Sequence, residues 1–209
     1  MRTNILTSDA QAQLTPDTVL SNLKAGNSNY TAANLTAVDI NDLRAASVYG
    51  QAPKAIVLSC IDSRVVVEEV FDQALGDIFV ARVAGNFVNT DIVASMEYAC
   101  KVAGSKLIVV LGHEGCGAVK AACDGVELGN ITSLLSNIQP AVDAVKPTVE
   151  APYNSANTAF VNAAIAENVN HTIGEIKSMS PILAEMEAAG EIAIKGGVYQ
   201  LAGGAVAWL

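Results

Sequence analysis

Three short apolar runs dominate the hydrophobic pattern of the first half of the chain. They read KAIVLSC over residues 54–60, DIFVARV over 77–83 and KLIVVLG over 106–112. A strand with one face in water alternates apolar and polar residues, whereas unbroken runs are typical of parallel strands covered on both faces. Helical segments separate the runs, so the sequence predicts an α/β fold with a mostly parallel central β-sheet flanked by helices.

Start and stop signals place the helices. Thr15 followed by Pro16 predicts a helix N-terminus, as does Ser180 followed by Pro181, and Thr90 is expected to cap a third helix. Pro140 is expected to kink or break the segment that contains it. Helices are predicted over residues 16–30, 39–50, 90–104, 115–125, 131–145, 158–179 and 181–190.

The two ends of the chain are expected to differ from the central pattern. Residues 1–50 precede the first strand and are predicted to form an N-terminal helical arm, which leaves residues 51–209 as the α/β core of a single domain. Near the other end, a strand over 191–201, a turn at Gly203-Gly204 and a return over 205–209 predict a C-terminal hairpin.

Composition and charge make some classes of binding partner improbable. A net charge of −9 disfavours nucleic acid and anionic membranes, because long-range repulsion opposes the encounter. No segment approaches the roughly 20 apolar residues of a membrane span and no export signal is recognisable, so a cytoplasmic protein with reduced cysteines is expected. Hydrophobic residues make up 51% of the chain and charged residues 16%, which indicates much hidden surface, either in a large core or against another subunit; an oligomer is expected.

Side chains that carry chemistry follow two of the predicted strands. Cys60, Asp62 and Arg64 come after the first strand, and His113 and Cys116 lie at the end of the third. Ligands of open parallel sheets bind beyond the carboxyl ends of the strands, so these five side chains converge if the two strands are neighbours. Two thiolates and an imidazole form a zinc ligand set with a fourth position open, as in catalytic sites.

Two other interpretations compete with a metal site. Taken singly, Cys60 and Cys116 are ordinary buried thiols, and His113 is a turn histidine. Cys60 as a nucleophile would use the charge of Arg64, but the spacing is too short for a phosphate-binding loop, and Asp62 would repel phosphate. A cysteine-protease arrangement with His113 as the base leaves Cys116 unexplained.

The two clusters resemble the motifs of β-class carbonic anhydrases: C-x-D-x-R at residues 60–64 and H-x-x-C at residues 113–116. The similarity includes GQAP at 50–53, GDIFVARVAGN at 76–86, SMEYAC at 95–100, GHEGCGAVKAA at 112–122 and the segment 180–201. It therefore covers nearly the whole chain from about Leu14.

The resemblance implies an enzyme that reversibly hydrates carbon dioxide to bicarbonate and a proton. One Zn²⁺ per chain would be held by Cys60, His113 and Cys116. Asp62, in a buried ion pair with Arg64, would orient a zinc-bound hydroxide toward carbon dioxide; released from that pair, it would occupy the open zinc position and block catalysis.

The resemblance also implies a substrate pocket shared between subunits. Gln51 would reach the substrate from the facing subunit, Phe79 and Tyr98 would line the pocket near the dimer interface, and Gly117 would bring a backbone N–H toward a thiolate. The family is built from dimers in which the N-terminal arm wraps the partner. A homodimer that pairs again into a homotetramer is therefore expected.

The sequence departs from the allosteric subgroup of this family at one informative position. That subgroup carries a tryptophan three residues before the first zinc cysteine, where this chain has Val57. The resemblance therefore implies the non-allosteric, open-site type, with bicarbonate inhibition absent or weak. His171, the only other histidine, is expected to be a solvated surface residue rather than a proton shuttle.

Two alternative functions remain. Relatives with the same zinc ligands hydrolyse carbonyl sulfide or carbon disulfide, which the ligands alone do not exclude. A non-catalytic, zinc-stabilised binding module is the other alternative. The presence of both Asp62 and Arg64 argues against it, because a structural zinc site would close with a fourth cysteine or histidine.

Overall fold

A computed structural model describes residues 1–209, with a five-stranded sheet at its centre. The strand order is β2-β1-β3-β4-β5, with bounds β1 (Ala55–Ser59), β2 (Ile78–Arg82), β3 (Leu107–His113), β4 (Ala193–Tyr199) and β5 (Val206–Trp208). Neighbours among β1 to β4 run parallel, and β5 returns antiparallel to β4. The predicted mostly parallel sheet and C-terminal hairpin are confirmed, and β1 and β3 are direct neighbours.

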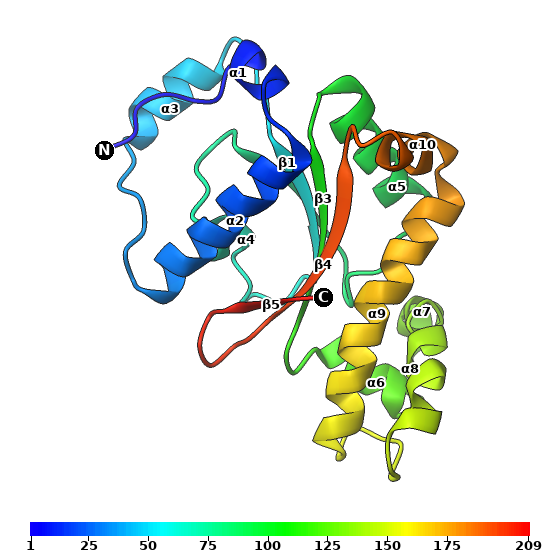
Figure 1. Ribbon diagram of the computed structural model, residues 1–209. Coiled ribbons are helices and arrows are strands. Elements are labelled where there is room, and N and C mark those ends of the chain that lie inside the picture. The colour runs from blue at the N-terminus through cyan, green and yellow to red at the C-terminus, as the bar shows by residue number, and fades with distance from the viewer.

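Helices cover both faces of the sheet and give the molecule three layers (Figure 1). One face carries α2 (Pro16–Thr31) and α4 (Val67–Val70), and the other carries α5 (Thr90–Glu97), α9 (Thr158–Met179) and α10 (Pro181–Ala188). The short helices α6 (Gly117–Cys123), α7 (Gly129–Leu135) and α8 (Gln139–Val145) lie beside the first half of α9. None of the helices combines the length and apolar character that crossing a membrane requires.

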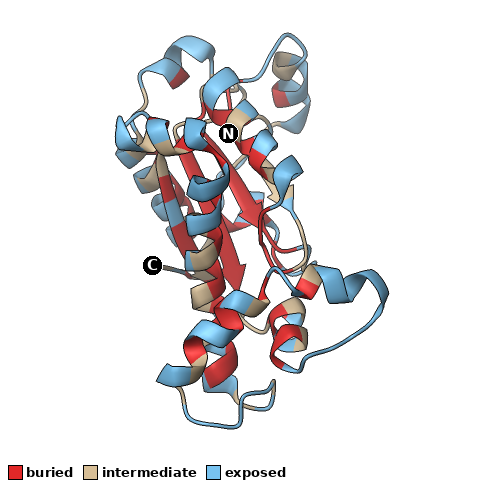
Figure 2. Cartoon of the chain, turned by 90° about the vertical axis from the view of Figure 1, so that its right-hand side faces the viewer, coloured by how far each residue is buried: buried red, intermediate tan, exposed pale blue.

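The core explains the unbroken apolar runs of the sequence. All residues of β1 and β3 are buried, as the red strands at the centre of Figure 2 show. Successive residues face opposite layers: Ile56 and Leu58 pack in the cluster with α5, α9 and α10, while Ala55 and Val57 pack in the cluster with α2. Because both faces are covered, neither set of alternate positions needs to be polar.

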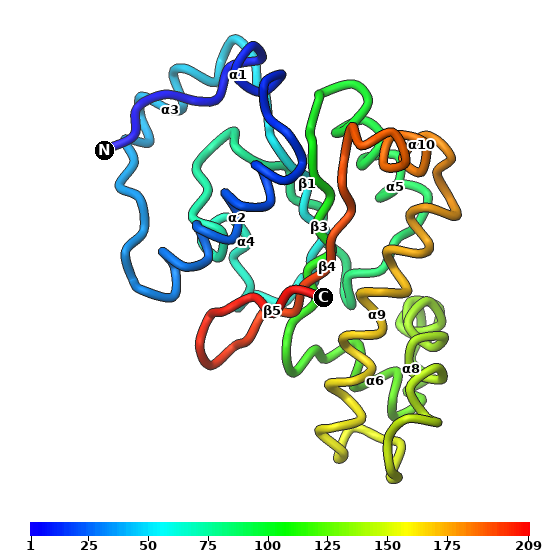
Figure 3. The backbone as a smooth tube through the Cα atoms, viewed as in Figure 1, coloured from blue at the N-terminus to red at the C-terminus, as the bar shows by residue number.

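The first 50 residues form an arm only in part. In this region α1 (Ser8–Ala12) and α3 (Ile40–Ser47) lie away from the sheet, but α2 is a core helix whose Val19 and Leu23 are fully buried. Asn27 on α2 donates a hydrogen bond to the Gly204 carbonyl at 2.8 Å and accepts one from the Val206 amide at 2.9 Å. As a result α2 and the C-terminal hairpin lie side by side (Figure 3).

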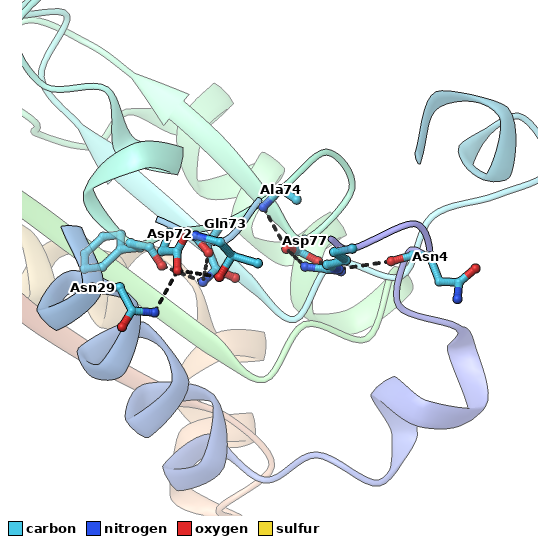
Figure 4. Close-up of polar contacts among 9 residues, drawn as sticks. Asn4, Asn29, Asp72, Gln73, Ala74 and Asp77 are labelled. Atoms are coloured by element: carbon cyan, nitrogen blue, oxygen red, sulfur yellow. Dashed lines mark hydrogen bonds and ion pairs between the residues drawn. The ribbon is translucent and has the colours of Figure 1, made fainter. Parts of the chain in front are cut away.

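Two aspartates attach the N-terminal segments to the region between α4 and β2 (Figure 4). Asp77 is fully buried and pairs with the guanidinium of Arg2, with 2.6 Å between Nη2 and Oδ1. Asp72 accepts hydrogen bonds at 2.8 Å from the Asn29 side chain and from both the amide and the hydroxyl of Thr36. These contacts hold the start of the chain and the α2–α3 connection in place.

Several predicted helix boundaries need correction. Asn89, not Thr90, caps α5, because its side-chain oxygen accepts the Ile92 amide at 3.0 Å. That helix becomes a π-turn at η1 (Tyr98–Val102). The predicted break at Pro140 is confirmed: this residue lies in the first turn of α8, and residues 136–138 separate α7 from α8. The segment after α8 begins with the 3₁₀ turn η2 (Lys146–Thr148).

Candidate metal centre

Cys60, His113 and Cys116 meet where β1 and β3 end. Cys60 directly follows β1, His113 is the last residue of β3, and Cys116 precedes the first residue of α6. The two sulfurs are 4.0 Å apart, and the ligand atoms of all three residues lie within 4.8 Å of one another. All three side chains are buried. The predicted convergence of these residues is confirmed, because the two strands that deliver them are hydrogen-bonded neighbours.

The imidazole of His113 is oriented by the backbone. Its Nδ1 lies 2.9 Å from the Glu114 carbonyl oxygen, which can only accept, so Nδ1 carries the proton of the neutral ring. Its Nε2 is buried and has no hydrogen-bond partner. An unpartnered buried nitrogen costs free energy unless another group meets its lone pair. A zinc ion held by this nitrogen and the two sulfurs would satisfy it, so the three residues fit such a metal.

Backbone amides act on both sulfurs. The Gly85 amide donates to the Cys60 sulfur at 3.3 Å, and the amides of Ala118 and Val119 in the first turn of α6 act to lower the pKa of Cys116. The hydrogen bond between the cysteines lowers the pKa of Cys60 and raises that of Cys116, which burial raises further. Metal ligation needs both thiols deprotonated, and these amides stabilise the resulting charge.

Asp62 lies at the side of the cluster, paired with Arg64. The guanidinium donates from Nε to Oδ1 at 2.9 Å and from Nη2 to Oδ2 at 2.7 Å, and the Arg64 amide donates to Oδ1 at 3.0 Å. These hydrogen bonds hold the pKa of Asp62 well below its usual range. Asp62 Oδ2 is 3.8 Å from His113 Nε2, next to the shared ligand position. The expected burial of the pair is wrong for this single chain, since the Arg64 side chain is 57% exposed.

Arg82 is a site residue that sequence reasoning missed. At the end of β2, it donates from Nε to the Cys60 carbonyl at 2.9 Å and from Nη2 to the Asp62 carbonyl at 2.7 Å. It therefore fixes the backbone between the metal ligand and the carboxylate. The available signal was an arginine at the end of an otherwise apolar strand, next to a strand with a cysteine at the same end.

Comparison with known proteins agrees with this geometry. A family model described as carbonic anhydrase matches residues 55–206. A carbonic anhydrase of Mycolicibacterium smegmatis is 38% identical over 185 residues, covering 88% of each chain, and carbonic anhydrase 2 of Mycobacterium tuberculosis is 36% identical over 180 residues, covering 86% of each. The chain belongs to the carbonic anhydrase family.

Solved structures of β-carbonic anhydrases share the fold. One of two tetrameric β-carbonic anhydrases from Sordaria macrospora superposes with a TM-score of 0.73 at 24% identity, covering 91% of this chain and 94% of that one. The β-carbonic anhydrase CafA of Aspergillus fumigatus gives a TM-score of 0.72 at 21% identity, with 92% and 89% covered. The fold of this chain is thus that of the β-class carbonic anhydrases.

The remaining residues suggested by the family motifs lie outside the ligand cluster. Gln51 is exposed and precedes β1, at the end of the strand opposite to Cys60. The rings of Phe79 and Tyr98 meet edge to face with centroids 6.3 Å apart, along an apolar groove of about 540 Å³ beside β2. Gly117 is the first residue of α6 and directly follows Cys116.

Two further expectations concern residues near the site. Val57 is fully buried on the α2 side of β1 and packs in the cluster that includes Tyr199. His171 is half-buried on α9, at the wall of a cavity of about 340 Å³ that also has Ser136, Asn137 and Glu175 in its lining. His171 is therefore less exposed than a solvated surface residue, and it is not a member of the ligand cluster.

Proposed function

We propose that this chain is a zinc-dependent carbonic anhydrase that interconverts carbon dioxide and bicarbonate. The observation that carries the proposal is the buried cluster of Cys60, His113 and Cys116, with a carboxylate beside the unpartnered His113 Nε2. When bound, zinc supplies a Lewis acid that lowers the pKa of water from about 15.7 to ~7, so that a nucleophile exists at neutral pH.

Asp62 would orient the attacking oxygen. Its low pKa keeps the carboxylate unprotonated, so it only accepts hydrogen bonds. Arg64 engages both carboxylate oxygens and limits the directions from which a further donor can approach Oδ2. If the attacking oxygen donates its O–H to Oδ2, one of its lone pairs would point away from the carboxylate, toward carbon dioxide. The same two hydrogen bonds would keep Asp62 out of the fourth metal position.

The proposed enzyme is of the open-site, non-allosteric type. Asp62 is paired with Arg64 rather than turned toward the sulfurs, which supports a site ready for substrate. Val57 supports the same type, since its short apolar side chain offers no hydrogen bond to an inhibitory bicarbonate. The expected result is a rate of hydration that bicarbonate lowers only as a product, without sigmoidal dependence.

Oligomerisation and location complete the proposal. We propose a homodimer that pairs into a homotetramer, supported by the exposed groove beside β2 and by the tetrameric β-carbonic anhydrases of Sordaria macrospora. Gln51, distant from the metal ligands of its own chain, would act at the site of the partner. A cytoplasmic location is proposed because the two cysteines outside the metal cluster, Cys100 and Cys123, are free thiols, as a reducing compartment maintains them.

Stopped-flow hydration of carbon dioxide, on protein of measured zinc content, tests the function. Asp62→Asn keeps the size of the side chain but removes its charge, and we expect kcat to fall about 10²-fold with zinc retained, the scale of a misplaced reacting group. Asp124→Asn is the control, because Asp124 is an exposed carboxylate that bonds Ser155 away from the cluster.

Two outcomes contradict the proposal. If zinc-replete wild-type protein hydrates carbon dioxide no faster than buffer does, the chain has no carbonic anhydrase activity. A faster release of hydrogen sulfide from carbonyl sulfide or carbon disulfide than hydration of carbon dioxide assigns the same zinc site to the other hydrolase reaction.

A further inference from the structure

The turn after β2 places one backbone amide on a metal-ligand sulfur. The Asn86 amide bonds the Val83 carbonyl at 3.0 Å and closes the turn, while the Gly85 amide points at Cys60 Sγ from 3.3 Å. Gly85 has a φ of +81°, and a Cβ there would come within 2.4 Å of Ile138 Cδ1. Only glycine therefore fits this position without movement of its neighbours.

A glycine amide needs an external restraint to stay in one orientation. Without a Cβ, Gly85 can rotate about both of its backbone bonds at little steric cost. Its carbonyl, on the far side of the same α-carbon, accepts a hydrogen bond from Nδ2 of Asn168 at 2.8 Å. Asn168 lies in the middle of the 22-residue helix α9 and is only 1% exposed. A buried side chain on a long helix thus fixes the second peptide unit of the glycine.

We infer that Asn168 is a positioning residue of the metal centre. By holding the Gly85 carbonyl it keeps the Gly85 amide on the Cys60 sulfur, where the amide stabilises the thiolate that ligates the metal. The chain of contacts runs from α9 through the turn to the ligand, so the helix rather than the loop sets the hydrogen bond. This inference rests on the zinc site proposed above.

The burial of Asn168 argues against a purely structural role. Its Oδ1 has no partner inside the protein, a situation that costs about 1–3 kcal/mol for a buried polar group. A helix position selected only for packing would avoid that cost with an apolar side chain, as its neighbours Ile165 and Val169 do. The amide Nδ2 bond to Gly85 is the single hydrogen bond that the side chain makes.

The test compares zinc affinity in matched variants. Asn168→Leu has the same number and branching of side-chain heavy atoms and no donor, and Asn168→Ser leaves space but is too short for the direct bond. One turn further along α9, Thr172→Val is the control, because Thr172 is also 1% exposed and its hydroxyl has no partner. We expect zinc dissociation constants, measured by competition with a chelator, to rise about 10-fold for both Asn168 variants. The control stays within twofold of wild type.

A spectroscopic readout separates positioning from packing. In Co²⁺-substituted protein the thiolate-to-metal charge-transfer band should move to longer wavelength in the Asn168 variants, since a sulfur without its amide donates charge more readily. The band of Thr172→Val should not move. A cooperative unfolding transition of each metal-free protein shows which variants fold. If Asn168→Leu does not fold, Asn168→Ser tests the positioning role.

The outcomes that overturn the inference are distinct from those that overturn the function. Zinc affinity and band position equal to wild type in a folded Asn168 variant refute the positioning role, as does an equal loss in Thr172→Val. Failure of the proposed function appears instead in the wild-type protein, as a lack of stoichiometric zinc binding or of carbon dioxide hydration.

Discussion

Asp72 links three segments through one carboxylate, with hydrogen bonds from Asn29 on α2 and from Thr36 in the following connection. Burial alone would raise the pKa of Asp72, but these hydrogen bonds lower it overall. A carboxyl group whose pKa is lower in the folded state than in the unfolded chain stabilises the fold above the unfolded value of about 3.9. That contribution is lost as the pH falls through the folded pKa.

Asp72→Asn should therefore destabilise the protein in a pH-dependent manner. Asparagine tolerates the positive φ of 51° at this position, so the change removes the charge and one acceptor oxygen without straining the backbone. We expect a loss of about 1 kcal/mol at pH 7, below the usual value for hydrogen bonds to a charged group because the site is partly solvated. Urea unfolding of the metal-free protein at pH 7 and near pH 3 measures the difference, which should shrink at the lower pH.

The exposed Glu127, which makes no side-chain hydrogen bond, provides the control for this experiment. Glu127→Gln should match wild type at both pH values. A destabilisation of Asp72→Asn that is equally large near pH 3 would mean that shape, not charge, accounts for the effect.

At the scale of single residues, the metal ligands were predictable and their supporting contacts were not. Cys60, His113 and Cys116 are recognisable because their residue types and their places at strand ends carry the chemistry. Arg82 and Gly85 act on the site through backbone groups, Arg82 by binding carbonyls and Gly85 by presenting its amide. Such roles depend on where the folded backbone goes, and residue type alone does not reveal them.

At the scale of elements, Ser180 joins α9, α10 and α5. It is fully buried, ends α9, and caps α10 by accepting the Leu183 amide at 3.1 Å. The same hydroxyl donates to Oε1 of Glu97 at the end of α5, at 2.5 Å. One hydroxyl therefore satisfies a helix N-terminus and fixes the relative position of three helices on one face of the sheet.

Ser180→Ala should lower the free energy of unfolding by about 1–2 kcal/mol, because a helix cap is lost and the partly buried hydrogen bond to Glu97 is broken. Equilibrium unfolding in urea measures the change. The control is Ser95→Ala: Ser95 is exposed in α5 and donates only to the Asp91 carbonyl in the same helix. This control should stay within about 0.5 kcal/mol of wild type, as surface changes usually do. Equal effects in the two variants would contradict a special role of Ser180.

Most elements could be predicted, because helix caps and apolar periods are local signals. Thr15 and Ser180 cap the helices that the sequence assigned to them. The π-turn over Tyr98–Val102 could not be foreseen, because the spacing of apolar residues does not show where a helical turn contains one extra residue. The burial of α2 was missed for a different reason. Its place before the first strand suggested an arm, although Val19 and Leu23 have the spacing of a packed helix face.

At the scale of the whole molecule, an apolar surface lies beside the free edge of the sheet. β2 is the outer strand, and the groove next to it has seven hydrophobic residues among its eight lining residues. Tyr98 is 53% exposed at this groove. Exposed edge strands and apolar patches are sites of association, and here the net charge of −9 on each chain opposes it. Assembly therefore depends on apolar burial being larger than electrostatic repulsion.

Tyr98→Asp should dissociate the proposed oligomer. The change replaces an apolar ring with a negative charge in an interface between chains that already repel each other. Multi-angle light scattering should find wild-type protein as a dimer or tetramer and the variant as a monomer. Dissociation should be greater at ~0.01 M salt, where the screening length is about 30 Å, than at ~0.15 M, where it is about 8 Å.

Leu128→Asp, at an exposed position outside the groove, should keep the wild-type mass. A monomeric wild-type protein at all concentrations would contradict both the interface and the action of Gln51 on a partner site.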